Sequence, residues 1–325
     1  VEVLNKGQTS ITDVNTNLLR NCLNKDLLSL STNYEKLKNA DLISICVPTP
    51  LRKSHTPDMS HVIEVSKKLS EVITEGQTIV LESTVYPGAT ENLVLPQLEK
   101  SGLKVNEDFF LAFSPERVDP GNKQYHISEI PKVVGGVSEE SSKRTAEIYN
   151  QVFDDIFTVN STNEAELTKL LENTYRAVNI GLINEISQVS NGMGANIWNV
   201  IEAADTKPFG FEAFYPGPGL GGHCIPVDPL FLSWAGRTNG SRTRFIELAD
   251  EINRQMPEYI VKRVTGVLNE EGKALSNSEI FVIGVAYKAN VSDTRESPAL
   301  EILQMLFDKR AKVEYYDPFV EEIEI

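Results

Sequence analysis

The chain has 325 residues, enough for two or three domains that each bury a core. Its 46 acidic and 31 basic residues give a net charge of −15, which disfavours nonspecific binding to nucleic acid and to anionic membranes. Cys22, Cys46 and Cys224 are far apart and form no C-x-x-C pair, which argues against a disulfide framework and against a structural metal site. No apolar run approaches the length of a bilayer span, and the first residues carry no signal-peptide pattern. We therefore expect a soluble, cytoplasmic protein with no metal, nucleic-acid or membrane partner.

The first half of the chain alternates short apolar runs with helical patterns. Strands are predicted at residues 42–47, 78–83, 109–113, 132–135 and 156–159, with helices at about 60–74 and between the last two strands. Strands that alternate with helices predict a parallel α/β sheet with ligands at the carboxyl ends of the strands.

The second half is first helical and then returns to alternation. Thr162 is predicted to cap a long helix to about residue 193, and more helix extends to about 272, interrupted by a glycine-rich loop. A strand at 279–283, a helix at 298–309 and a strand at 312–316 follow. The predicted fold is α/β: two Rossmann-like doubly wound sheets joined by a helical middle domain, with domains at 1–161, 162–272 and 273–325. The first domain lacks an opening strand with a glycine-rich turn, and the last stops after one β-α-β unit, so we expect both to be incomplete.

The glycine-rich loop, residues 217–229 (GPGLGGHCIPVDP), is the most informative segment. Its glycines permit close approach of the backbone to a ligand, and Cys224 at its end can be a nucleophile where its surroundings favour the thiolate. Alternatively, Cys224 is a small hydrophobic residue buried in the core. Gly217, Gly219 and Gly222 also match the dinucleotide pattern G-x-G-x-x-G, but no strand precedes them and prolines follow, so we reject that match.

Four loops follow predicted strands, at residues 47–50, 82–88, 114–117 and 284–288. They bring Pro48, Thr49, Thr84, Glu116 and Lys288 to the strand ends where an α/β sheet binds ligands. Each could equally be an ordinary strand-to-helix turn, with Thr84 as a cap hydroxyl and Glu116 as a solvated carboxylate.

Two further candidates lie four residues apart on the long helix. Lys169 and Asn173 share one helix face, although a solvated lysine and a surface amide are the default interpretation. His223 is a poor base for Cys224, because adjacent side chains of an extended loop point apart. Asp228 is predicted to be a helix N-cap with Pro229 at the first helical position, and it could serve catalysis as well.

Five ordered motifs resemble the UDP-glucose/GDP-mannose dehydrogenase family throughout the chain. They are residues 82–91 (ESTVYPGATE), 114–121 (SPERVDPG), 165–174 (AELTKLLENT), the glycine-rich cysteine loop, and 287–297 (YKANVSDTRES). The cysteine loop is most similar to those of bacterial and archaeal UDP-N-acetylglucosamine 6-dehydrogenases. Members of the family open with a strand and a G-x-G-x-x-G turn, and this sequence departs from that pattern.

The resemblance implies a four-electron oxidation of the C6 alcohol of a UDP-sugar to a carboxylate, with NAD as the cofactor, for surface polysaccharide synthesis. It implies UDP-N-acetylglucosamine or another UDP-N-acetylhexosamine as substrate, and a homodimer formed through the helical middle domain. It assigns catalysis to Cys224, Lys169, Asn173, Asp228, Glu116 and Thr84, NAD binding to Pro48, Thr49, Thr84 and Arg295, and substrate binding to Glu116, Lys169, Asn173, Tyr215, Gly221, Tyr287 and Lys288. Three alternatives stay open: a UDP-glucose 6-dehydrogenase, a relative that performs one two-electron oxidation of a hydroxy acid, and a non-catalytic sugar-nucleotide binder.

Overall fold

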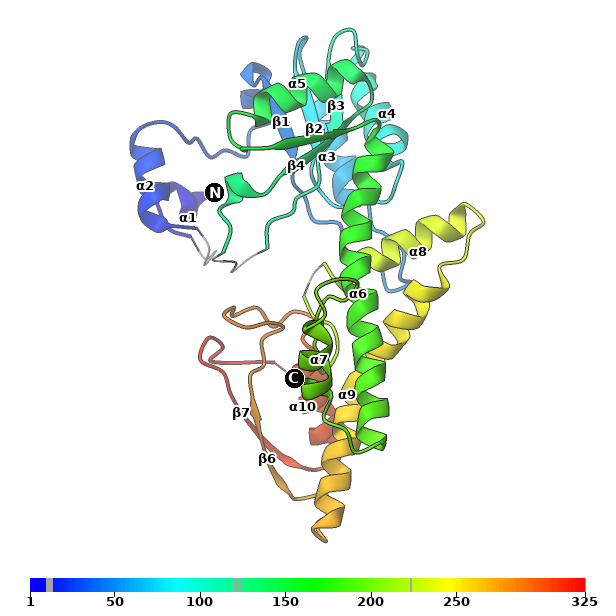
Figure 1. Ribbon diagram of the computed structural model, residues 1–325. Coiled ribbons are helices and arrows are strands. Elements are labelled where there is room, and N and C mark those ends of the chain that lie inside the picture. The colour runs from blue at the N-terminus through cyan, green and yellow to red at the C-terminus, as the bar shows by residue number, and fades with distance from the viewer. Residues whose placement is uncertain (10–13, 120–121, 123, 223, 325) are drawn as a thin grey trace. The chain divides into compact units, whose positions relative to one another are not determined.

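The computed structural model describes residues 1–9, 14–119, 122, 124–222 and 224–324 (Figure 1). The chain divides into two compact units. The first unit contains residues 1–52 and 57–169, and the second contains residues 53–56 and 170–325.

The first unit is built on a five-stranded sheet in the order β1 (Leu42–Ile45), β2 (Thr78–Leu81), β3 (Phe110–Phe113), β4 (Lys132–Gly136), β5 (Ile156–Val159). Strands β1, β2 and β3 are parallel, and so are β4 and β5. The side chains of β2 and β3 are buried along their whole length, as continuous apolar runs are when both faces of a sheet are covered. The five predicted strands are confirmed.

One pair of strands differs from the expectation of a parallel sheet. Strand β4 runs antiparallel to β3, with Ala112 opposite Gly136 and Phe113 opposite Gly135. An apolar run is equally compatible with either direction, so the sequence pattern could not predict this reversal. The reversal places the first residue of β4, Lys132, beside the loop that follows β3, because antiparallel strands put opposite ends at one edge.

Helical segments flank the sheet of the first unit. They are α1 (Glu2–Asn5), α2 (Thr16–Asn24), η1 (Tyr34–Asn39), α3 (Ser60–Ser70), η2 (Thr90–Val94), α4 (Leu95–Leu98), η3 (Glu99–Ser101), η4 (Ile127–Glu129) and α5 (Glu139–Tyr149). Helix α3 buries Val62, Ser66 and Leu69, which lie one helical turn apart on one face. Helix α5 starts at the cap Ser138, whose side chain accepts a hydrogen bond from Ser141 N.

A buried carboxyl group links the loop after β2 to the first turns of helix α6 (Thr162–Gly192). Glu166, fully buried, accepts hydrogen bonds from Gly88 N, Thr90 N and Thr90 Oγ1. Burial raises the pKa of Glu166 to about 7, against the opposing effect of these hydrogen bonds. This contact fixes the loop that carries Thr84.

The second unit combines long helices with a small parallel sheet. Its elements after α6 are α7 (Ile197–Asp205), α8 (Asp228–Thr238), α9 (Arg244–Glu270), β6 (Glu279–Ile283), α10 (Pro298–Asp308) and β7 (Lys312–Tyr316). Helices α6 and α9 pack closely, since a Cβ on Gly181 would lie 3.2 Å from Ala249. Asn184 donates to Asn253, which donates to the carbonyl of Ala177, so buried amides also join the two helices. The predicted long helix, the later helices and the last β-α-β unit are confirmed, but Thr162 is the first residue of α6 rather than its cap, and its Oγ1 donates to Glu91.

Candidate functional site

The loops after β1 and β2 are held together at the carboxyl ends of these parallel strands. Ser83 Oγ accepts a hydrogen bond from Val47 N at 2.7 Å and donates to the carbonyl of Ile45. Pro48 and Thr49 directly follow Val47, and the half-buried Thr84 directly follows Ser83. The three predicted cofactor residues of this unit therefore lie at one edge of the sheet, where an α/β fold binds nucleotides.

The loop after β3 presents a carboxylate whose two oxygens are held differently. Glu116 Oε1 accepts hydrogen bonds from Arg117 N at 2.8 Å and Val118 N at 2.7 Å, while Oε2 lies 3.2 Å from Lys132 Nζ. Burial alone would raise the pKa of Glu116, but the charge of Lys132 and these hydrogen bonds lower it. The carboxyl group is thus an anion at neutral pH, and it is oriented before any ligand arrives.

Lys169 is brought to the same loop. Its Nζ donates a hydrogen bond to the main-chain carbonyl of Glu116 at 2.6 Å. The ammonium group therefore lies beside the backbone of the carboxylate residue rather than in an ion pair with the carboxylate itself. The structure brings together these two predicted residues, which are 53 positions apart in the chain.

The glycine-rich loop packs tightly against Tyr287. A Cβ on Gly221 would lie 2.7 Å from Tyr287 Cβ and 2.8 Å from the carbonyl oxygen of Glu296, and a Cβ on Gly222 would lie 2.8 Å from the tyrosine ring. Gly222 also has a φ of +84°, and its N–H donates to the carbonyl of Arg295. Two predicted substrate residues, Gly221 and Tyr287, are therefore in contact. The backbone of the loop can come this close to the tyrosine only because glycine has no side chain.

The loop then leads into helix α8 through an exposed cysteine. The carbonyl of Cys224 accepts hydrogen bonds from Val227 N at 3.1 Å and Asp228 N at 2.8 Å, which places the cysteine one turn before the buried Asp228. Asp228 Oδ2 accepts a hydrogen bond from Asn173 Nδ2 at 2.5 Å. Three predicted catalytic residues are therefore close together in the second unit.

The predicted N-cap of α8 is wrong by one position. Val227 is the N-cap, and Asp228 is the first helical residue. The carboxylate of Asp228 bonds Asn173, which fixes the amide on α6. Its partner is 55 residues away in the chain, so the local capping pattern gave no sign of it. His223 lies outside the described residues.

The remaining predicted ligand residues occupy the same unit. Arg295 donates to both carboxylate oxygens of Asp293, with Nη2 to Oδ2 at 2.6 Å. The hydrogen bond to Asp293 raises the pKa of Arg295, and the charges of Asp293, Tyr287 and Cys224 act in the same direction. An anionic ligand at Arg295 would compete with Asp293. Lys288 is half-buried, and Tyr215 stacks on Trp198 with ring centroids 5.7 Å apart.

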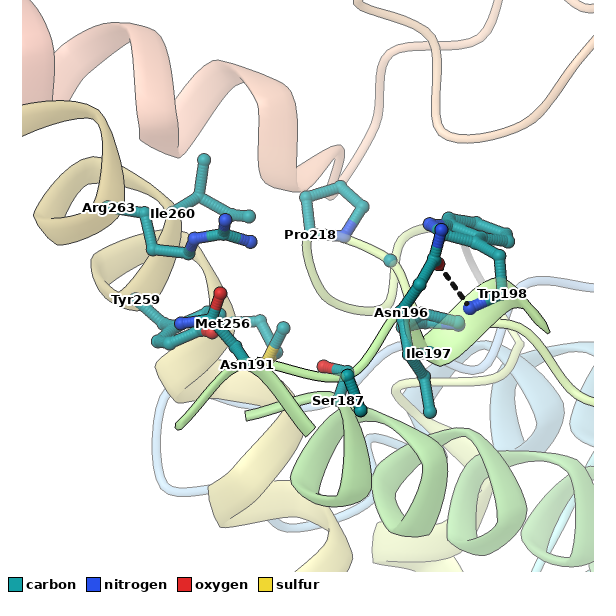
Figure 2. Close-up of a pocket in the computed structure, with 13 residues that line it drawn as sticks. Ser187, Asn191, Asn196, Ile197, Trp198, Pro218, Met256, Tyr259, Ile260 and Arg263 are labelled. Carbon is teal, nitrogen blue, oxygen red and sulfur yellow. Dashed lines mark hydrogen bonds between the residues drawn. The ribbon is translucent and has the colours of Figure 1, made fainter. Parts of the chain in front are cut away.

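A pocket of about 390 Å³ is lined in part by Trp198, the partner of Tyr215 in this stacked pair. Figure 2 shows Ile260 and Arg263 of α9 across the pocket from Asn196 and Trp198, with Pro218 of the glycine-rich loop between them at the rim. None of the predicted catalytic residues lines it. Gly217 and Pro218, at the start of the cysteine loop, line the pocket.

Sequence reasoning missed several residues that shape the site. Lys132 and Glu82 form a buried ion pair of 2.6 Å in the first unit, and Asn184 Oδ1 accepts a hydrogen bond from Gly217 N at the start of the cysteine loop. The signal that could have found the ion pair was opposite charge at the ends of two otherwise apolar strands. Across the described part of the chain, no cluster of His, Cys, Asp or Glu is arranged to hold a metal ion. The described helices include none that is both long and apolar enough to span a bilayer.

An α/β sheet with ligand loops at its strand ends, joined to a helical unit with a cysteine loop, defines a nucleotide-binding enzyme of the α/β class. Three family models match in order: the NAD binding domain of the UDP-glucose/GDP-mannose dehydrogenase family at residues 1–153, its central domain at 163–255 and its UDP binding domain at 281–325. The chain belongs to this family and is an NAD-dependent nucleotide-sugar dehydrogenase.

Several relatives extend the comparison. The chain is 35% identical over 299 residues to a UDP-N-acetyl-D-glucosamine 6-dehydrogenase of Pseudomonas aeruginosa, covering 90% of this chain and 69% of that protein. It is 34% identical to a UDP-N-acetyl-D-mannosamine dehydrogenase of Methanococcus maripaludis, covering 93% and 67%. The solved structure of a UDP-D-ManNAc dehydrogenase from Pyrococcus horikoshii matches with a TM-score of 0.90 at 33% identity, covering 98% of this chain and 76% of that one.

Proposed function

We propose that this enzyme oxidises the C6 hydroxyl of a UDP-N-acetylhexosamine, UDP-N-acetylglucosamine in the first place, to the uronic acid. The observation that carries the proposal is an exposed cysteine at the end of a tightly packed glycine loop, one turn before the buried Asp228, which is hydrogen-bonded to the half-buried Asn173. The names of the relatives from Pseudomonas and Methanococcus support an acetylated amino sugar. A UDP-uronic acid is an activated building block, which fits surface polysaccharide synthesis in the cytoplasm.

The reaction removes four electrons in two steps. NAD+, when bound, accepts the hydride in each of them. In the first, the C6 alcohol loses a hydride and a proton and becomes an aldehyde. An aldehyde has no suitable hydride to give until a nucleophile adds, so the thiolate of Cys224 adds to it and forms a thiohemiacetal. Loss of the second hydride gives a thioester, and water then releases the carboxylate and restores the thiol.

The remaining catalytic roles follow from charge and position. Lys169 stabilises the developing alkoxide, and Asn173, held by Asp228, adds a hydrogen bond. Glu116, kept ionised, accepts the proton of the water that cleaves the thioester, and Asp228 orients the water or the lysine. Thr84 positions water or cofactor.

Ligand binding divides between the two units in this proposal. Pro48, Thr49 and Thr84 fit one wall of the NAD site, because they share the carboxyl edge of β1 and β2. Tyr215, Gly221, Tyr287 and Lys288 bind the UDP-sugar, and Arg295 meets cofactor phosphate. We assign the functional domains to residues 1–161, 162–272 and 273–325.

Substrate preference tests the assignment to acetylated amino sugars. We expect kcat/KM for UDP-N-acetylglucosamine to exceed that for UDP-glucose by about tenfold or more, as a site shaped around one substituent discriminates against its absence. Initial rates of NADH formation with UDP-N-acetylglucosamine, UDP-N-acetylmannosamine and UDP-glucose measure this directly. Equal or reversed preference would replace the assignment with a UDP-glucose dehydrogenase and leave the chemistry intact.

The other two functions make different predictions for the same assay. A two-electron oxidation of a hydroxy acid needs no Cys224 and yields one NADH for each substrate consumed, whereas the proposed reaction yields two. A non-catalytic binder yields none. The combination of Lys169, Cys224 and Asp228 has little use in a binder, which is why we favour the enzyme.

We also propose that the protein is a homodimer formed through helix α6. An apolar stripe of exposed side chains runs along α6 at helical spacing, formed by Leu171, Leu182, Ile186 and Val189, and the exposed Met193 directly follows the helix. Exposed large side chains of this kind on one face are typical of a protein interface. Sedimentation velocity is expected to give a dimer for the wild type and a monomer for Leu182→Lys with Ile186→Lys. Phe157→Lys, which changes an exposed apolar residue of β5, is the matched control and should stay dimeric. A monomeric wild type at micromolar concentration would contradict the proposal.

A further inference from the structure

A single buried lysine lies between two carboxylates at the edge of the first sheet. Lys132 Nζ is 2.6 Å from Glu82 Oε2 and 3.2 Å from Glu116 Oε2, and its side chain is only 4% exposed. Glu82 directly follows β2, and Glu116 follows β3. Strand β4 pairs antiparallel with β3, with Phe113 opposite Gly135, and counting three residues further along each segment sets Lys132 opposite Glu116, in agreement with their ion pair.

Several neighbours fix the position of this lysine. Glu82 Oε1 accepts hydrogen bonds from Tyr149 Oη at 2.6 Å and from Ser44 Oγ at 2.7 Å, so the carboxylate that holds Lys132 is itself held from α5 and β1. The ammonium group also lies over the rings of Tyr149 and Phe153, at 5.7 and 5.3 Å from their centroids. Lys132 is enclosed by protein groups and does not reach a ligand at the surface.

Glu116 is held by the same lysine but is open to solvent. Its side chain is 52% exposed, its Oε1 is fixed by two backbone N–H groups, and its Oε2 faces Lys132. Two carboxylates that share a site raise each other's pKa unless a cation lies between them. The ammonium group of Lys132 lies between Glu82 and Glu116 and is shared by the two carboxylates, and its charge lowers the pKa of Glu116.

We propose that Lys132 is a positioning residue that orients the carboxylate of Glu116 and keeps it charged, and that Glu82 moderates its strength by sharing the ammonium group. The inference rests on the proposed function, in which Glu116 accepts a proton from the water that cleaves the thioester. In this proposal the buried residues Lys132, Glu82 and Tyr149 influence the reaction by setting the position and charge of Glu116.

The other charged groups near Glu116 stay the same in the test. Lys169 bonds the carbonyl of Glu116, and Arg117 donates to the carbonyl of Pro131. Partial burial raises the pKa of the Cys46 thiol, and burial with the adjacent Glu82 raises that of Tyr149, so both are uncharged near neutral pH. Substitutions at Lys132 and Glu82 therefore change the charge on only one side of Glu116, while its other charged neighbours stay the same.

The test compares the pH dependence of uronic acid formation in the wild type, Lys132→Met and Glu82→Gln. Because Glu116 must be ionised to accept a proton, the rate falls on the acid side at its pKa. Lys132→Met removes the cation and should move this acid limb to higher pH by about one unit. Glu82→Gln removes the competing anion, so the limb should move to lower pH. Lys132→Arg keeps the charge and should restore the limb to near its wild-type position.

If Lys132 and Glu82 had only a structural role, their variants would not shift the acid limb in opposite directions. Loss of packing alone would lower the rate of both variants at every pH and leave the limb in place. An unmoved limb, or a shift in the same direction in both variants, overturns the inference. If Lys132→Met does not fold, as judged by circular dichroism, Glu82→Gln decides the question alone, since its shift must be to lower pH.

Glu116→Gln separates the inference from the proposed function. If this variant forms uronic acid at the wild-type rate, the role of Glu116 in hydrolysis is wrong, and the proposed function fails at that step. If it is inactive while the limbs stay unmoved, only the role of Lys132 is wrong. The ¹³C carboxyl signal of Glu116, titrated without substrate, reports its pKa independently of turnover and should follow the same directions in the variants.

Discussion

Replacing Cys224 with Ala is expected to stop uronic acid formation after the first oxidation. The first hydride transfer needs no thiol, so the variant should form at most about one NADH for each active site and then stall at the aldehyde. Loss of covalent catalysis should lower the steady-state rate by about 10³-fold or more. Single-turnover NADH absorbance and chromatography of the sugar products measure the two steps separately.

The other cysteines provide the matched controls. Cys22 and Cys46 belong to the first unit, and Cys46 lies 3.2 Å from Ser44 Oγ near the buried ion pair. Cys22→Ala and Cys46→Ala should each retain two NADH for each sugar consumed. A Cys224→Ala variant that makes uronic acid at a near wild-type rate would show that this cysteine only packs.

Replacing Lys169 with Met is expected to block the reaction one step earlier. The ammonium group is the proposed partner of the alkoxide that forms as the C6 hydroxyl loses its proton, and removal of such a donor costs about 10² to 10³ in rate. Neither aldehyde nor NADH should accumulate in a single turnover, in contrast to Cys224→Ala. Stopped-flow absorbance with excess enzyme distinguishes the two variants.

A surface lysine of the same unit controls for the loss of charge. Lys143 lies exposed on α5, and Lys143→Met should react as the wild type does. If Lys169→Met still shows a full burst of one NADH for each site, its place in the first oxidation is wrong. The contact with the carbonyl of Glu116 would then be its whole role.

The sequence predicted the elements of the fold well, because each has a local cause. The apolar runs of β2 and β3 are recognisable from neighbouring residues alone. The direction of β4 is not recognisable in this way, since its pairing of Phe113 with Gly135 depends on how the chain returns to the sheet. Local pattern determines where a strand is, and tertiary packing determines its direction.

The sequence indicated which residues belong to the candidate site, but not which of these residues contact one another. The pairing of Asn173 with Asp228 and the packing of Gly222 on Tyr287 join segments more than 50 residues apart, and no spacing rule contains them. The buried Lys132 was missed because a lysine at the start of an apolar strand is usually solvated. In the structure Lys132 is instead buried, with the carboxylates of Glu82 and Glu116 around its ammonium group.

The central claim is that Cys224 forms a thioester with the oxidised sugar, and mass spectrometry of enzyme quenched during turnover tests it most directly. With UDP-N-acetylglucosamine and NAD+ in excess, the peptide that contains Cys224 should gain the mass of the acyl group of the UDP-N-acetylaminouronic acid. The peptides that contain Cys22 and Cys46 should stay unmodified, and the adduct should disappear as product forms. Uronic acid accumulation with no adduct on Cys224 at any quench time, together with an active Cys224→Ala variant, would contradict the account.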